Sequence, residues 1–128
     1  MAYLLDTSVL IHLRDGDQDV TDRVAAIQGA LLMSVVTRVE LEGGVHRDPA
    51  HATVRRARLN AILGAIPTVA FDADAADAYG RIVAQVGYSR RKLLDRMIAA
   101  QALVHHATVV TLNRDDFSDV PGLALESW

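Results

Sequence analysis

Short apolar runs alternate with longer amphipathic segments along the chain, and this alternation predicts strands and helices in turn. The short runs are bounded by polar or turn-forming residues, which is typical of buried strands. The predicted strands cover residues 3–5, 30–36, 67–71 and 108–112, and a further short run at 123–125 is a candidate fifth strand.

The segments between these runs carry apolar residues at helical spacing, and most follow a Ser, Thr or Asp that can cap a helix. The predicted helices cover residues 7–13, 19–29, 37–45, 50–63, 73–86 and 94–107. The helix at 94–107 has almost no polar side before its end at His105 and His106. A helix without a polar side is expected to be buried, so we place this one centrally.

Strands that alternate with helices predict a parallel sheet covered on both faces, joined by right-handed crossovers. The expected fold class is therefore α/β, a three-layer α/β/α sandwich around a parallel sheet of four to five strands. The length of 128 residues and an apolar fraction of 51% suit a single domain over residues 1–128, with a real core. We find no repeat and no linker that would divide it.

Composition narrows the range of functions. The net charge of −3 argues against a protein that grips nucleic acid over its whole surface, but it leaves room for local basic patches. The absence of cysteine excludes disulfides, thiolate metal sites and cysteine nucleophiles. No apolar run is long enough to cross a bilayer, and Asp6 interrupts the first one, so we expect neither membrane contact nor a secretory signal and place the protein in the cytoplasm.

Carboxylates recur where the predicted strands end and the next helices begin. They are Asp6, Glu40, Asp95 and one acid of the segment 113–116. Because the carboxyl ends of parallel strands share one edge of a sheet, these side chains are expected to converge. Like charges brought together are costly unless a cation lies among them, and oxygen-only ligands suit Mg²⁺ or Mn²⁺.

Each carboxylate also has a purely structural interpretation. Asp6 can simply cap the first helix. Glu40 lies three residues after Thr37, which is the spacing of a capping box. Asp95 can simply favour the positive end of a helix dipole, and the acids at 115 and 116 can be ordinary loop residues.

The motifs that carry these acids resemble the PIN domain, and more closely the VapC toxins of bacterial toxin–antitoxin pairs. The matching segments are Leu4–Ser8, Ser34–Thr37 with Glu40, Leu41 and Gly44, Asp95 with 98–100, and Val110–Asn113 with Asp116 and Phe117. The resemblance spans almost the whole chain, in the same order and spacing.

The resemblance implies a PIN-like fold and a Mg²⁺-dependent endoribonuclease, a homodimer that a VapB-type antitoxin holds inactive. The implied catalytic and metal-binding residues are Asp6, Glu40, Asp95 and Asp116, with Asn113 as an alternative oxygen donor; Thr7, Ser8 and Thr111 would support the site or start the helix. Some relatives carry Asp where this chain has Asn113, so it stays open which residue of Asn113, Asp115 and Asp116 completes the site.

A basic turn, Arg90, Arg91 and Lys92, comes directly before Asp95 and is a candidate for contact with the RNA backbone. The other basic cluster, at 55–58, is interpreted as a solvated helix face.

The sequence supports rival functions less well. A phosphoryl transfer on Asp6 of the haloacid-dehalogenase kind needs an Asp where Ser8 stands, and a receiver domain needs a lysine after its last strand. The remaining alternative is a non-catalytic module that kept this fold and binds RNA or protein.

Overall fold

The computed structural model describes all residues from 1 to 128. Five strands form one sheet in the order β3-β2-β1-β4-β5, and every neighbouring pair is parallel. The strands are β1 (Ala2–Leu5), β2 (Ala30–Ser34), β3 (Thr68–Val69), β4 (Ala107–Thr111) and β5 (Leu125–Ser127). The central strand is thus the first in the sequence, and its neighbours β2 and β4 are far apart along the chain.

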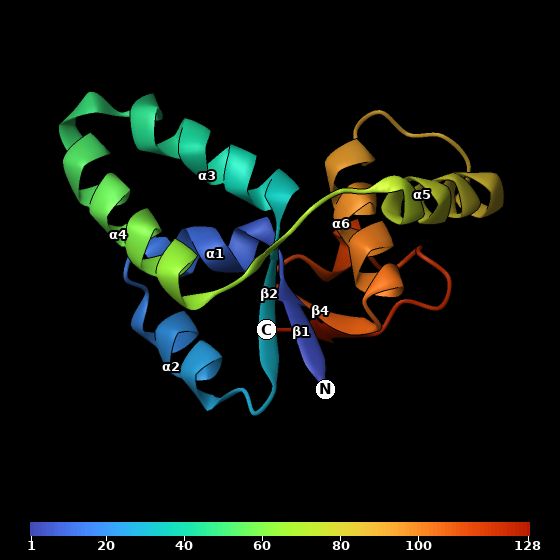
Figure 1. Ribbon diagram of the computed structural model, residues 1–128, viewed down its shortest axis with the longest axis horizontal. Coiled ribbons are helices and arrows are strands. Elements are labelled where there is room, and N and C mark those ends of the chain that lie inside the picture. Colours follow the sequence, from blue (N-terminus) through green and yellow to red (C-terminus); the bar gives the residue numbers. More distant parts are fainter.

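Helices cover both faces of the sheet, as Figure 1 shows. The four helices α1 (Thr7–Arg14), α2 (Gln18–Ala26), α3 (Val35–Arg47) and α4 (Ala52–Ala65) lie on one face, whereas α5 (Ala73–Val86) and α6 (Leu93–Val104) lie on the other. Two 3-10 turns, η1 (Pro49–His51) and η2 (Arg114–Asp116), complete the chain. The expected three-layer α/β/α fold with a parallel sheet is confirmed, with five strands.

Each face of the sheet has its own apolar core, because successive strand residues point to opposite faces. Leu4 and Val109 face α5 and α6, where they pack in one cluster with Ile98. Leu5 and Val110 face the four-helix layer and pack with Met33 and Leu41. This explains why the strands read as continuous apolar runs rather than as an alternation. Val54, which helical spacing predicts to face inward, is 49% exposed.

Several predicted boundaries are wrong by a few residues. The strand predicted to reach Val36 ends at Ser34, because the Ser34 side chain accepts the N–H of Val36 and so starts α3 there. The helix predicted over 94–107 ends at Val104; His106 has φ of 51°, a left-handed conformation that ends the helix. Ala107 already belongs to β4. The fifth strand lies at Leu125–Ser127 rather than at 123–125.

None of the helices is long and apolar enough to span a bilayer.

Candidate functional site

Asp6 lies at the carboxyl end of the central strand and is 4% exposed. Its Oδ1 accepts the backbone N–H of Val9 at 3.0 Å and the hydroxyl of Ser8 at 2.6 Å, while its Oδ2 accepts the hydroxyl of Thr111 at 2.6 Å. Asp6 is therefore the N-cap of α1, and Thr7 and Ser8 stand in the first turn rather than at the cap. Burial raises the pKa of Asp6, and the charge of Asp116 adds to this, although the three hydrogen bonds oppose it.

Glu40 is an exposed residue of α3 that reaches across to α1. Its Oε1 accepts the hydroxyl of Thr7 at 2.8 Å. Because the hydrogen of Thr7 goes to Glu40, Thr37 donates its own hydroxyl to Thr7 at 2.9 Å. The capping-box interpretation of Glu40 is wrong: Ser34 caps α3, so Thr37 lies inside the helix. A cap at Ser34 places Glu40 in the second turn, free to face the edge of the sheet.

Asp95 lies in the first turn of α6, and its pKa is raised to about 6. Burial is the first cause, and the charges of Asp116, Asp6 and Glu40 follow. Lys92 acts in the opposite direction. Four carboxylates that come from four different parts of the chain therefore lie close enough to repel one another at one edge of the sheet.

The segment after β4 brings two acids with different environments. Asp116 is half-buried and is followed by Phe117, which is 1% exposed and anchors the end of η2 in the core. Asp115 is exposed. The charge of Asp116, not that of Asp115, contributes to the raised pKa of both Asp6 and Asp95. Asn113 is exposed, and its backbone N–H donates to Thr111 at 2.9 Å.

This edge offers a divalent ion oxygen ligands and a surplus of negative charge. No three acidic or histidine side chains form a compact group that could hold an ion by themselves. The arrangement is therefore open, which suits Mg²⁺, because this ion keeps several of its waters and needs only one or two direct carboxylates. Repulsion among the four acids is the observation that fits a cation at this edge.

The basic turn before α6 divides into free and paired residues. Arg90 and Arg91 are exposed and make no ion pair. Lys92 donates to Asp119 at 3.0 Å, and Arg96 donates to the same carboxylate oxygen at 3.1 Å. Arg90 and Arg91 are thus available to an RNA backbone, whereas Lys92 already has an anionic partner.

Two buried polar residues that hold the site were missed in the sequence. Arg96 is 3% exposed, and its Nη1 donates to the carbonyl of Gly87 at 2.6 Å, which ties the start of α6 to the end of α5. Gln101 of α6 bonds the Ser34 hydroxyl through Oε1 and donates from Nε2 to the Val69 carbonyl at 3.1 Å. The only available signal was a polar residue within the apolar helix, and such a residue usually has a buried partner.

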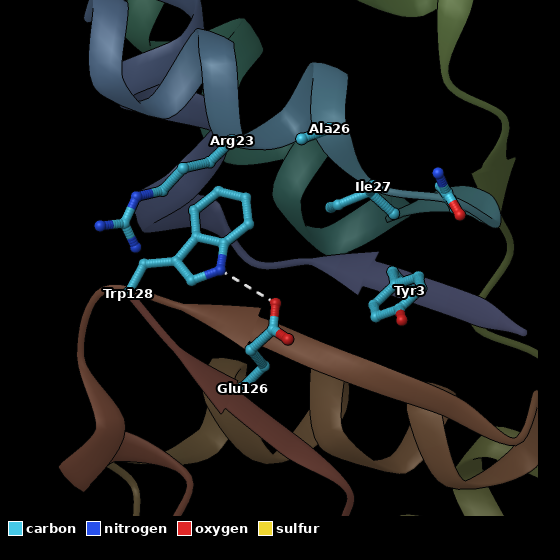
Figure 2. Close-up of a pocket in the computed structure, with 7 residues that line it drawn as sticks. Tyr3, Arg23, Ala26, Ile27, Glu126 and Trp128 are labelled. Carbon is cyan, nitrogen blue, oxygen red and sulfur yellow. Dashed lines mark hydrogen bonds between the residues drawn. The ribbon is translucent and has the colours of Figure 1, made fainter.

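A separate pocket of about 700 Å³ lies under α2 at the β5 side of the sheet (Figure 2). Arg23 stacks over the Trp128 ring at 5.8 Å from its centre, and the indole N–H donates to Glu126 at 2.9 Å. Tyr3 and Ile27 form the opposite side of this pocket. It shares no residue with the acidic edge, so we keep the two apart.

Comparison with known proteins places this geometry in a family. The PIN domain model matches residues 3–123. The tRNA(fMet)-specific endonuclease VapC of Shigella flexneri is 29% identical, with 100% of this chain and 98% of that protein aligned. Ribonuclease VapC2 of Rickettsia felis is 25% identical over the same shares.

Several solved structures with the same fold are toxin–antitoxin complexes. VapBC2 of Rickettsia felis, bound to promoter DNA, has a TM-score of 0.87 at 24% identity, over 100% of this chain and 99% of the other. VapBC-5 of Mycobacterium tuberculosis has a TM-score of 0.73 at 32% identity, over 98% and 96% of the two chains. With a family match over nearly its whole length and four converging acids at the sheet edge, the chain belongs to the PIN domain family.

Proposed function

We propose that the chain is a Mg²⁺-dependent endoribonuclease toxin of the VapC type, which hydrolyses RNA phosphodiester bonds in the cytoplasm. The observation that carries the proposal is the convergence of four carboxylates, whose repulsion adds to burial in raising the pKa of Asp95 to about 6. Nucleases of this kind are generally dependent on a divalent metal. Mn²⁺ would serve the same oxygen ligands.

The chain's own residues have distinct tasks in this reaction. Asp6 is held in one orientation by its three hydrogen bonds, and Glu40 by Thr7, so both carboxylates are aimed before the ion arrives. Asp95 and Asp116 would complete the set of oxygens around the ion, directly or through its waters, with Asn113 as an alternative oxygen donor. The ion would supply an activated water and neutralise charge at the phosphodiester.

Arg90 and Arg91 would hold the RNA backbone beside these acids, because they are exposed, unpaired and one turn ahead of Asp95. Lys92 would join them only by leaving Asp119. Neutral variants of the two arginines should bind RNA more weakly and with a smaller dependence on salt.

A VapB-type antitoxin and a second copy of the chain are the proposed protein partners. Two of the large apolar side chains that the protein leaves exposed, Val39 at 68% and Leu94 at 45%, stand next to Glu40 and Asp95. Apolar exposure around an acidic site fits a surface that a partner covers. The support from known proteins is that several structures of the same fold are VapBC complexes.

The deciding experiment incubates the purified protein, free of antitoxin, with total RNA in Mg²⁺ and in chelator. We expect discrete cleavage products in Mg²⁺ alone, and none from Asp6→Asn, Glu40→Gln or Asp95→Asn. Gln keeps the bond to Thr7, so loss of activity in that variant assigns Glu40 to the reaction rather than to the fold. RNA binding without cleavage in any divalent metal would instead identify a non-catalytic module.

A further inference from the structure

A groove of about 910 Å³ runs beside the acidic edge, between α1 and α3, and the function proposed above does not use most of it. The two helices run side by side in the same direction, in contact at Thr7 and Glu40 near their starts. Further along, Arg14 of α1 faces Gly44 of α3. Glu40, Gly44 and Arg47 follow one another at helical spacing, so the floor of the groove leads from the acidic edge to a cluster of arginines.

Arg14 is the unusual member of this cluster. Only 5% of it is exposed, and its side chain makes a single hydrogen bond, from Nε to Asp15 at 3.0 Å. Neither Nη atom donates to any protein acceptor, and neither is closed off from solvent, since the only buried side-chain nitrogen without a partner is Arg96 Nε. The outer edge of this guanidinium, a planar fork suited to phosphate, therefore faces the groove with free donors.

Gly44 makes room for that fork. A methyl group at this position would stand 2.7 Å from Arg14 Nη1, so any larger residue would displace the guanidinium. The neighbouring Gly43 is also helical, but a methyl group there meets nothing within 4 Å. Gly44 is thus required by Arg14, whereas Gly43 is not.

The acids of the groove neutralise its arginines only in part. Asp15 forms an ion pair with Arg14 through Nε, and Asp48 accepts from the Ala50 N–H and from His51. Glu40 belongs to the acidic edge. Arg47 and Arg55 have no carboxylate partner, and Arg55 donates only to the Gly44 carbonyl at 2.8 Å. The far end of the groove therefore keeps positive charge.

We infer that this groove is a subsite for a backbone phosphate of the RNA strand, held by Arg14, Arg47 and Arg55 some two helical turns from Glu40. The inference rests on the proposed function, because a strand placed at the acidic edge must continue in some direction, and the groove opens there. A phosphate supplies two acceptor oxygens for the two Nη groups of Arg14, which have no protein acceptor. A neighbouring phosphate of the same RNA strand would pair with Arg47 farther along the groove.

The test compares Gly44→Ala with Gly80→Ala, because Gly80 lies in α5, outside the groove, and a methyl group there meets nothing within 4 Å. Both variants gain the same helix propensity, but only the first displaces Arg14. Arg47→Gln is the second variant, and Arg81→Gln, an exposed arginine of α5 on the other side of the sheet, is its control. Affinity for a short single-stranded RNA is measured in chelator over a range of salt.

We expect Gly44→Ala and Arg47→Gln to bind RNA several-fold more weakly, with the salt slope of Arg47→Gln reduced by about 0.7. The two controls should match the parent. A single methylphosphonate linkage, which removes one phosphate charge, should weaken parent binding at one position of the RNA and have no effect there in Gly44→Ala. Parent affinity and slope in both test variants would overturn the subsite, and so would tight binding of an acidic peptide with none of these RNA effects.

A second measurement separates this inference from the proposed function. Inorganic phosphate is titrated into the labelled protein while the side-chain Nε resonances of its arginines are followed. Shifts of Arg14 that vanish in Gly44→Ala support the subsite even if the protein cleaves no RNA. Cleavage that proceeds while phosphate leaves Arg14 unmoved keeps the nuclease and removes the subsite.

Discussion

Asp95 is the residue whose ionisation its neighbours oppose most clearly, and this makes two pH effects predictable. Its pKa is 3.8 when unperturbed and about 6 in the folded protein. Between these values the folded state binds a proton that the unfolded state releases. In chelator the free energy of unfolding should therefore decrease as pH rises from about 4 to 6, with no further loss from this group above that. Chemical denaturation across this range should show the decrease in the parent and a smaller one in Asp95→Asn.

If Asp95 binds the metal as proposed, metal and proton compete for its carboxylate, so the rate of RNA cleavage at limiting Mg²⁺ should rise with pH around 6. Saturating Mg²⁺ should move the midpoint to lower pH. Cleavage rates at two Mg²⁺ concentrations give this comparison, and a midpoint that Mg²⁺ does not move would separate Asp95 from the metal.

Asp6 caps α1 and is also a proposed metal ligand, and two substitutions separate these two tasks. Asp6→Asn keeps an oxygen that can accept the Val9 N–H, so the helix cap remains. It also removes the buried negative charge that burial disfavours, as the raised pKa of Asp6 indicates, so the melting temperature without metal should stay level or rise. Asp6→Ala loses the helix cap and should lower the free energy of unfolding by about 1 kcal/mol. Both should lose RNA cleavage. Thermal melts in chelator and cleavage assays on both variants test these expectations. An Asp6→Asn variant that cleaves RNA would contradict the proposed role of Asp6 in the reaction.

The fourth proposed ligand is one of three residues, Asp116, Asn113 or Asp115. Asp116 is the favoured one, because it is half-buried and its charge acts on Asp6 and Asp95. Asp116→Asn should lower activity strongly and raise the Mg²⁺ requirement, Asn113→Ala should lower it moderately, and Asp115→Asn should leave it nearly unchanged. Cleavage over a Mg²⁺ titration measures all three, and Asp115→Asn serves as the charge-matched control.

Residue identity predicted which acids converge, but not how each is held. The spacing of Thr37 and Glu40 fits a capping box as well as a functional site. Only the observed cap at Ser34 shows that Glu40 is not part of a capping box. Hydrogen bonds such as Thr111 to Asp6 join residues 105 positions apart, and nothing local in the sequence marks them.

The start of α6 is the element on which Asp95 depends. Arg96 ties this turn to Gly87 and Asp119 from a buried position, so Arg96→Met should lower the free energy of unfolding by about 2 kcal/mol and reduce cleavage. Lys92→Met removes only the more exposed contact to Asp119 and should change stability by less than about 1 kcal/mol. Urea unfolding of the two variants tests this, and equal losses would contradict it.

Element types were predictable from apolar periodicity, whereas element ends were not. Ala107 is apolar and suits either a helix or a strand, so the pattern alone extends the helix of 94–107 past its real end at Val104. The helix ends at a left-handed residue, His106, where many helices have a glycine. Because His106 is not a glycine, the sequence does not indicate this end. In contrast, Asp72 and Gly87 are unambiguous cap and stop residues, and α5 lies where they predict.

At the scale of the whole molecule, the metal should stabilise the entire fold, because its proposed ligands come from the junction of β1 and α1, from α3, from α6 and from the segment after β4. Mg²⁺ at about 100 times its dissociation constant should raise the free energy of unfolding by about 2.7 kcal/mol. Calorimetry with and without Mg²⁺ should show this gain in the parent and in Asp115→Asn, and much less of it in Asp6→Asn. A full gain in Asp6→Asn would place the ion elsewhere.

The layered parallel fold followed from the alternation of elements, but the order of the strands did not. Alternation fixes neither which strand is central nor which pairs meet, because those choices depend on packing between distant segments. The structure puts β1 between β2 and β4, with register Leu5 to Met33 and Leu5 to Val110.

This strand order has a consequence for biosynthesis. A ribosome releases β1 first, but the edge of β1 that pairs with β4 stays unpaired until residues 107–111 have emerged. Until then Asp6 lacks the hydroxyl of Thr111, and Asp116 is missing altogether. A nascent chain therefore carries no assembled nuclease next to the messenger that encodes it until residues 107–116 have emerged.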